Sequence, residues 1–339
     1  MKKFDKSKVN KILVIKPAAV GDVLLSTPVV ENLRYNFPEA EIYFLTQKFC
    51  KEVLTGNPFI TRVLTYDLNL DGGWFIIKNI RRQRYDLIID LFGNPRTALI
   101  TYFSRARYKV GFKFRQRKYA YNIKLDSRGG EIHNVEFNLD ALRALGLEVK
   151  TSQPKFYINH VHDEFAEKFF KDNSLAGKNV IGINPCGTWK TKVWYLEKFA
   201  ELIKMFDDSY RFLVFWGYAD EQSQAQKLRD MTGNNVVLVP QVNLKYLGTL
   251  MKHCKVFLTN DTGPMHIASA LGVNVAAIFG PTNYRLQGPL NSNSLVIKNE
   301  KLDCLGCNLT KIENCPNEHK CMAELNASYV FEKLQNFLR

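Results

Sequence analysis

The stretch from Asp261 to Pro264 combines residue types that can bind a phosphate. It follows an apolar run and precedes a segment with helical spacing, whose first turn tolerates proline. Free backbone N–H groups and the helix dipole would make an anion site there, to which Thr262 could add a hydroxyl and Gly263 a close backbone approach. His266, one turn on, would bond the phosphate or hold Asp261. The alternative is that Asp261 or Thr262 only caps the helix and that His266 is structural.

A second candidate anion site is the sequence NPCGTWKTKVW, residues 184–194. This loop follows the first strand of the second half and contains Gly187, Thr188 and Lys192. Small, hydroxyl and cationic residues can neutralise a diphosphate, with Lys192 as a point charge. The loop lacks the Gly-Lys-Ser/Thr ending of a P-loop, and no G-x-G-x-x-G follows the first strand of either half. An ATPase or a dehydrogenase is therefore disfavoured.

Asp22 is the candidate general base. It follows Gly21 in the sequence KPAAVGDVLLSTPVV, directly after the first strand of the first half. A carboxylate at this edge of a sheet could accept the proton of a substrate hydroxyl. The competing interpretation is that Asp22 is an ordinary helix cap.

Four cysteines near the C-terminus have the spacing C-x2-C-x7-C-x5-C, with a histidine, His319, between the last two. The cysteines are Cys304, Cys307, Cys315 and Cys321. This spacing could hold a tetrahedral structural zinc ion. The alternative is four thiols without a metal, because a reducing cytoplasm disfavours disulfides.

The elements that carry these residues alternate between short apolar strands and helices in both halves of the chain. The strands expected in the first half are 11–16, 41–46, 62–66, 85–92 and 107–112, and those in the second are 178–185, 210–217, 235–240, 255–260 and 274–280. Such alternation predicts two doubly wound parallel sheets. Residues 147–160 form the expected linker, and ligands should bind in a cleft at the carboxyl ends of the strands.

The net charge of +14 is concentrated between Arg96 and Arg128, where ten Lys or Arg residues accompany a single acid, Asp126. Such a segment would attract nucleic acid, an anionic membrane or a polyanionic substrate, unless it is only a solvated surface. No apolar run is long enough to span a bilayer, and the N-terminus does not resemble a signal peptide. We therefore expect a cytoplasmic protein.

Several motifs, taken in their order and spacing, resemble the glycosyltransferase family 9 heptosyltransferases of lipopolysaccharide core synthesis. The resemblance covers nearly the whole chain. The motifs are VIKPAAVGDVLLSTPVVENLR, YDLIIDLFGNPR, HNVEFNLDALRALG, NPCGTWKTKVW, NDTGPMHIASALG, IFGPT and the cysteine cluster. The chain departs from the family pattern at Cys186-Gly187 and at Trp189, so the base and the sugar of the donor stay open.

The resemblance implies an α/β GT-B fold, with two Rossmann-like doubly wound domains facing a cleft. Residues 1–155 would form the acceptor-binding domain and residues 156–321 the nucleotide-sugar-binding domain, while the helix in 322–339 would pack back on the N-terminal domain. The activity implied is inverting, metal-independent transfer of a heptose from ADP-heptose, with no cofactor required. Asp22 matches the base of the family, and the donor-binding positions are Thr188, Lys192, Asp261, Thr262, Gly263 and His266.

The acceptor implied is the acidic lipopolysaccharide inner core, either Kdo-lipid A or a heptosyl acceptor. Arg96 and His133 are the candidate acceptor contacts, and the basic segment would face phosphates or Kdo sugars at the inner face of the cytoplasmic membrane. We therefore expect peripheral membrane association and no nucleic-acid partner. The alternatives are a family 9 transferase that uses another nucleotide-sugar and, from a different class, a basic nucleic-acid-binding protein.

Overall fold

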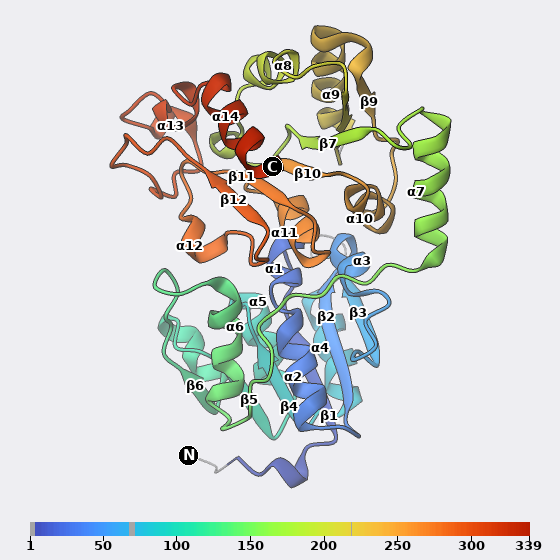
Figure 1. The fold of residues 1–339 in the computed structure, drawn as a ribbon. Helices are drawn as coiled ribbons and strands as arrows, with labels where there is room; N and C mark the ends of the chain where they lie inside the picture. The colour runs from blue at the N-terminus through green and yellow to red at the C-terminus, as the bar shows by residue number, and fades with distance from the viewer. Residues whose placement is uncertain (1–3, 68–71, 218) are drawn as a thin grey trace. The chain divides into compact units, whose positions relative to one another are not determined.

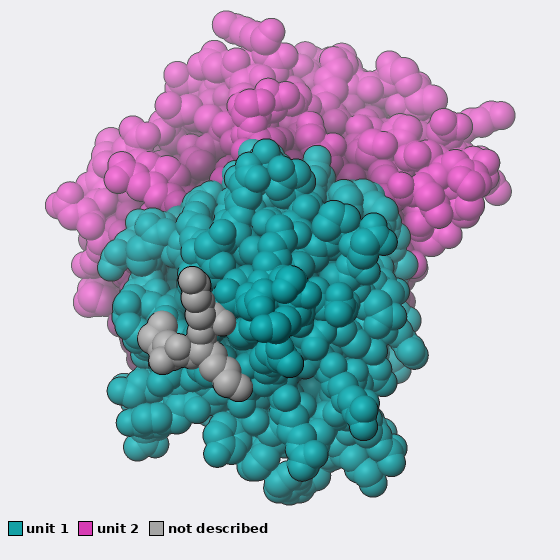
Figure 2. Space-filling model, turned by 90° about the horizontal axis from the view of Figure 1, so that it is seen from below, with its two compact units in different colours: residues 1–157 teal, residues 158–339 magenta. Residues whose placement is uncertain are grey.

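The computed structural model describes residues 4–67, 72–217 and 219–339. The chain divides into two compact units, residues 1–157 and residues 158–339, which Figure 2 shows in different colours. The expected domain boundary after residue 155 lies two residues before this division. Each unit has its own sheet and its own core.

Unit 1 is built on a six-stranded parallel sheet in the order β3-β2-β1-β4-β5-β6 (Figure 1). The strands are β1 (Lys11–Ile15), β2 (Glu41–Gln47), β3 (Arg62–Tyr66), β4 (Leu87–Asp90), β5 (Tyr108–Phe112) and β6 (Ile123–Leu125). The helices are α1 (Val20–Leu24), α2 (Thr27–Asn36), α3 (Lys51–Leu54), α4 (Gly73–Gln83), α5 (Pro95–Phe103) and α6 (Asn134–Arg143). Apolar residues of α4 and α5 cover one face of the sheet, and α2 packs beside α6.

Unit 2 repeats this topology, because its sheet has the order β12-β11-β10-β7-β8-β9 and is again parallel throughout (Figure 1). The strands are β7 (Asn179–Asn184), β8 (Tyr210–Val214), β9 (Val236–Leu238), β10 (Val256–Asn260), β11 (Val275–Ile278) and β12 (Ser294–Ile297). The helices are α7 (His160–Asp172), α8 (Leu196–Lys204), α9 (Ala219–Thr232), α10 (Leu244–Lys252), α11 (Gly263–Ala270), α12 (Tyr284–Gln287), α13 (Lys320–Ala323) and α14 (Ala327–Leu338). Two doubly wound Rossmann-like sheets in one chain confirm the expected fold class.

The C-terminal helix requires a correction. We expected the helix within 322–339 to pack back on the N-terminal domain, but α14 packs on α8 as part of the core of unit 2. Val330 and Leu334 of α14 are fully buried in that core. The apolar face of this helix therefore packs within its own unit.

Candidate functional site

The two motif-bearing loops of unit 2 leave its sheet side by side. β7 and β10 are neighbours in the sheet. The strands that follow β7 extend the sheet toward one edge, and the strands that follow β10 extend it toward the other. The loop 185–194 follows β7, and Asp261 follows β10 directly. Ligands of open α/β sheets bind at such a switch point, beyond the carboxyl ends of the strands.

An ion pair joins the two loops. The Nζ atom of Lys192 lies 2.8 Å from Oδ2 of Asp261, and both side chains are largely buried, with 14% and 4% of their surface exposed. The same carboxylate oxygen accepts a hydrogen bond of 2.7 Å from the hydroxyl of Thr282. Asp261 therefore holds the lysine in place rather than capping α11.

Buried Asn260, the last residue of β10, holds the loop that carries Lys192. Its Oδ1 atom accepts a hydrogen bond of 3.0 Å from the backbone N–H of Trp194, and its Nδ2 atom donates to the carbonyls of Asn184 and Cys186, each at 3.4 Å. Gly187 keeps the loop close to β10, because a Cβ there would come within 3.1 Å of the Thr262 methyl group. The position of Lys192 is thus fixed by backbone contacts at both ends of the loop.

The remaining predicted donor residues lie around this ion pair. Gly263 begins α11, and Thr262 occupies its N-cap position without a capping side-chain hydrogen bond. The Thr262 hydroxyl instead accepts from the amide of Asn184 at 3.0 Å and donates to the Asn260 carbonyl at 3.3 Å. His266 is buried within α11, whereas Thr188 is exposed in its loop. The helix N-terminus therefore presents its backbone N–H groups beside a held cation, which suits an anion.

A pocket of about 290 Å³ adjoins this anion site. Thr282, which donates to Asp261, lines the pocket together with the aromatic ring of Tyr284 and the cations Arg285 and Lys298. Phosphate-binding backbone, aromatic surface and cations are the surroundings that a nucleotide requires. The sequence motif IFGPT was recognised as part of the family resemblance, but nothing in it indicated the pocket.

Asp22 lies in the corresponding place in unit 1, at the start of α1 after β1. Its Oδ2 atom accepts a hydrogen bond of 3.1 Å from the backbone N–H of Ala19, so the carboxylate does cap its own short helix. The side chain stays half-exposed. Capping fixes one carboxylate oxygen and orients the group, which is compatible with its use as a base.

Lys16 is a buried cation near Asp22 that sequence reasoning did not single out. It follows β1 directly, and its Nζ atom donates to the carbonyl of Leu91 at 3.2 Å. Burial lowers the pKa of Lys16, against the opposing effect of the carboxylates of Asp22 and Asp90. Burial raises the pKa of Asp90, whose carboxylate accepts from the Tyr121 hydroxyl at 2.7 Å. The one sequence signal that could have identified Lys16 was its position, a lysine at the end of an otherwise apolar strand.

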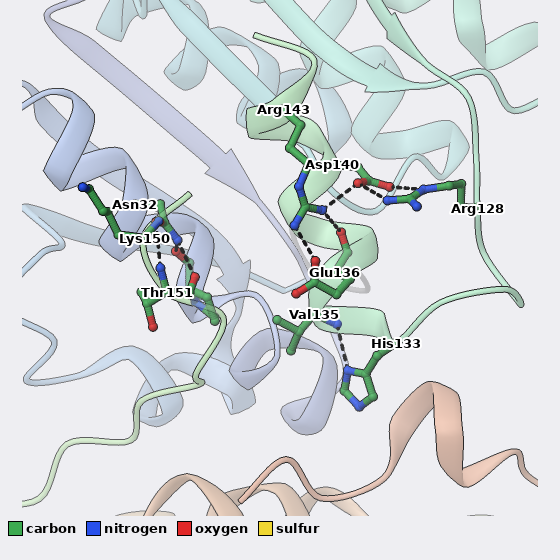
Figure 3. A network of polar contacts seen from close by, with 10 residues as sticks. Asn32, Arg128, His133, Val135, Glu136, Asp140, Arg143, Lys150 and Thr151 are labelled. Atoms are coloured by element: carbon green, nitrogen blue, oxygen red, sulfur yellow. Dashed lines mark hydrogen bonds and ion pairs between the residues drawn. The ribbon is translucent and has the colours of Figure 1, made fainter. Parts of the chain in front are cut away.

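The two predicted acceptor residues lie on different helices of unit 1. Arg96 is exposed in the first turn of α5. His133 is the N-cap residue of α6, and its Nδ1 atom accepts a hydrogen bond of 3.2 Å from the backbone N–H of Val135 (Figure 3). Because Nδ1 accepts, the proton of the neutral ring resides on Nε2.

Two cations of the basic segment 96–128 are paired with acids. Arg128 forms two hydrogen bonds with Asp140, of 2.5 and 2.9 Å, and Arg143 joins the same carboxylate and also pairs with Glu136 (Figure 3). Lys113 forms a 2.8 Å ion pair with Asp126. Part of the positive charge is therefore neutralised within unit 1.

The cysteine cluster lies in a segment that supports the donor loop. The imidazole of His319 contacts this loop through Nε2, 2.7 Å from the carbonyl of Thr191, and its Nδ1 atom lies 3.3 Å from the Tyr195 hydroxyl. Burial, together with the neighbouring thiols of Cys304, Cys307 and Cys315, raises the pKa of Cys321 to about 11. In the part of the chain that the structure describes, no three His, Cys, Asp or Glu side chains are grouped so as to hold a metal ion. The zinc site stays a prediction.

Comparison with known proteins decides the family. The model of glycosyltransferase family 9 (heptosyltransferase) matches residues 74–317, which is well over half of the chain. The chain belongs to glycosyltransferase family 9. As a member of this family it is a glycosyltransferase, and the resemblance seen in its motifs is confirmed.

Other members of family 9 match over nearly the full length. Lipooligosaccharide heptosyltransferase 2 of Haemophilus influenzae is 25% identical over 355 residues, covering 96% of this chain and 99% of that protein.

Two solved structures show the same fold. A family 9 glycosyltransferase from Veillonella parvula has a TM-score of 0.85 at 21% identity, with 99% of each chain covered. ADP-heptose lipopolysaccharide heptosyltransferase II of Escherichia coli has a TM-score of 0.78 at 22% identity, covering 97% of this chain and 98% of that one. The GT-B fold is therefore confirmed.

In the described part of this family 9 enzyme, none of the helices is long and apolar enough to cross a bilayer. Sequence reasoning missed residues that act on the site through others, notably Lys16, Asn260 and Thr282. Asn260 is the first residue of the recognised motif NDTGPMHIASALG, but its role in holding the loop after β7 follows only from the pairing of β7 with β10.

Proposed function

We propose that the chain transfers a heptose from ADP-heptose to an acidic acceptor of the lipopolysaccharide inner core, either Kdo-lipid A or a heptosyl acceptor. Transfer proceeds with inversion and needs no metal ion. The observation that carries the proposal is the Lys192–Asp261 ion pair beside the N-terminus of α11. The relatives, among them an ADP-heptose lipopolysaccharide heptosyltransferase, support the choice of sugar and acceptor.

The donor diphosphate binds at Lys192 and the first turn of α11. An Nζ ammonium group has three N–H donors, so Lys192 can bond a phosphate oxygen while it keeps its bond to Asp261. The backbone N–H groups that begin α11, with Gly263, add donors of fixed position. The pocket beside Thr282 receives the nucleoside, where Tyr284 and the nearby cations contact the base and the ribose.

Asp22 acts as the general base in this proposal. The acceptor oxygen forms a bond to the anomeric carbon on the face opposite ADP, while the bond from that carbon to the β-phosphate oxygen breaks. The electron pair of the broken bond leaves with ADP, and the acceptor proton passes to the Asp22 carboxylate. Lys192 and the α11 N-terminus stabilise the charge that grows on the diphosphate, which is the role of preorganised electrostatics.

The acceptor contacts come from Arg96 and His133. The exposed guanidinium of Arg96 suits a phosphate or a Kdo carboxylate, and the Nε2–H of His133 can donate to a sugar oxygen. Because such acceptors are anchored in the cytoplasmic membrane, the enzyme works at its inner face as a peripheral protein.

Transfer by the purified protein tests this function. The protein is incubated with ADP-heptose and a truncated Kdo-lipid A acceptor, with EDTA present, and the product is analysed by mass spectrometry. We expect the mass of one heptose to be added, at a rate unchanged by EDTA. Transfer from UDP- or GDP-sugars instead would replace the donor, and no transfer from any nucleotide-sugar would refute the proposal. Metal analysis of the same preparation tests the predicted zinc ion at the four cysteines.

A further inference from the structure

Unit 1 carries a second pocket, of about 860 Å³, whose wall is strongly cationic. Six exposed cations line it: Lys78, Arg81, Arg82, Arg84, Arg105 and Arg107. The acid in its wall, Asp86, accepts hydrogen bonds of 3.0 Å from the backbone N–H groups of Asn10 and Lys11. Within the described residues no ion pair joins any of the six cations to an acid. Their positive charge is therefore available to a partner.

Two of these arginines occupy strained backbone positions. Arg84 is the C-cap residue of α4 and has a φ of 54°, and Arg105 follows the end of α5 with a φ of 65°. Glycine is the usual residue in this left-handed conformation, because a side chain there crowds the backbone. Arginine at both places keeps two charges at the pocket in spite of this crowding.

Large apolar side chains project beside the cations. Trp74 is 72% exposed and also lines the pocket, and Phe75 next to it is 60% exposed. On the neighbouring helix α5, Leu99 and Tyr102 are each about half exposed. The face of α4 that covers the sheet is already filled by Ile76, Ile77 and Ile80, so the exposed aromatic side chains are not required for the core.

This surface, formed by the six cations with Trp74 and Phe75, is distinct from the candidate active site. Asp86 and Arg107 precede β4 and β5, so the pocket reaches the amino ends of these strands. Asp22 follows the carboxyl end of β1, which runs parallel to β4. A partner on this surface therefore leaves Asp22 uncovered.

We propose that this surface docks the enzyme on a bilayer rich in anionic phospholipid. The cations contact lipid phosphates, and Trp74 and Phe75 enter the headgroup region, where aromatic rings are favoured. The attraction between an anionic bilayer and a cluster of cations grows with each added charge. Cations and aromatic rings could also bind nucleic acid. The choice of lipid rests on the proposed function, because the acceptor of the proposed reaction is anchored in a membrane.

The test is co-sedimentation of the full chain with vesicles of phosphatidylcholine alone or mixed with phosphatidylglycerol. One variant combines Arg81→Gln, Arg82→Gln and Arg105→Gln, and another combines Trp74→Ser and Phe75→Ser. The matched control combines Lys171→Gln, Lys227→Gln and Arg229→Gln, which removes three exposed charges from unit 2. We expect binding to the anionic vesicles only, weakened at least about tenfold in both surface variants and little changed in the control.

Equal binding of anionic vesicles by the control and the surface variants would overturn the proposal. A wild-type chain that does not bind anionic vesicles would also overturn it. Binding of single-stranded DNA that is lost in the same variants, without vesicle binding, would assign the surface to nucleic acid instead. Transfer to a lipid-free acceptor sugar should be unchanged in both surface variants. Vesicle binding by a chain that transfers no heptose would refute the proposed function and leave the docking surface standing.

Discussion

At the scale of single residues, the candidate site depends on charges that are held by other groups. The Asp22 carboxylate caps its own helix and lies near the buried cation of Lys16. Lys192 is fixed by Asp261, which is held in turn by Thr282. Each group that would act on a substrate is therefore oriented before a substrate binds, which lowers the cost of reorganisation during the reaction.

Asp22→Asn should lower kcat by roughly a hundredfold or more, because an amide cannot accept the acceptor proton. Its side-chain oxygen can still accept from Ala19, so α1 should stay capped and ADP affinity should be nearly unchanged. Steady-state transfer kinetics and calorimetric titration with ADP measure the two effects. Glu39→Gln, at an exposed site of the same unit, is the control. Near-normal turnover in Asp22→Asn would remove Asp22 as the base.

Lys192→Met should weaken ADP binding and lower kcat, because the diphosphate loses the cation that Asp261 holds in place. The expected loss in kcat is roughly a hundredfold. Lys190→Met, two residues away at an exposed position, is the matched control and should leave both quantities near the wild-type values. Titration with ADP and transfer kinetics check this. Equal effects of the two substitutions would mean that general charge, and not the pair with Asp261, governs binding.

At the scale of elements, the strands that border the switch points were predictable, and so were two of the four edge strands, β3 and β9. β1, β4, β7 and β10 are apolar runs that end at recognisable turns. The edge strands β6 and β12 were missed, because Lys124 interrupts the three residues of β6 and polar residues enclose the short apolar run of β12.

Other elements were misjudged for local reasons. Residues 22–37 have the spacing of a single helix but belong to two, α1 and α2. Pro28 lies in the first turn of α2, and the hydroxyls of Ser26 and Thr27 donate to backbone carbonyls at the break. The contact between Lys192 and Asp261 joins residues 69 positions apart and exists only because β7 pairs with β10. Local sequence patterns identify each motif separately. The contact between the motifs can be predicted only when the order of the strands in the sheet is known.

The polar network at α6 makes a pH-dependent contribution to stability. Burial alone would raise the pKa of Asp140, but hydrogen bonds from Arg128 and Arg143 outweigh it and lower that pKa below its usual value. An acid whose pKa is lower in the folded state stabilises the fold above its unfolded pKa of about 4. This stabilisation is lost as the pH falls through the folded pKa.

Asp140→Asn should therefore lower the melting temperature at pH 7, and the difference from the wild type should shrink steadily below about pH 4. Thermal unfolding followed by circular dichroism across this range measures it. Asp126→Asn, which removes an exposed ion-pair partner of Lys113, should have little effect at any pH. A difference that stays constant from pH 7 to pH 3 would show that the network acts through shape and not through charge.

At the scale of the whole molecule, two units with the same strand order each contain a complete core. The C-terminal helix belongs to the second of these cores, since Leu334 is fully buried there and Trp194 donates its indole N–H to the carbonyl of Leu325 just before α14. The two units should therefore differ in their response to damage at the C-terminus.

Leu334→Asp should destabilise residues 158–339 by about 3–5 kcal/mol, because it buries a charge and leaves a cavity. Residues 1–157 should keep their stability. Hydrogen exchange followed by mass spectrometry locates the loss of protection, and Gln335→Asp on the exposed side of the same helix is the control. Loss of protection throughout residues 1–157 would contradict the assignment of α14 to unit 2.

The ion pair of Lys192 with Asp261 also affects how a donor would be attracted from a distance. The chain has a net charge of +14, but the lysine at the anion site already has a carboxylate at 2.8 Å, so this pair has no net charge before a ligand arrives. A neutral pair gives little long-range steering, and its contacts with a diphosphate act only at short range. Donor affinity should therefore respond weakly to ionic strength, whereas attachment to anionic vesicles through the unpaired arginines should weaken steeply as salt is added.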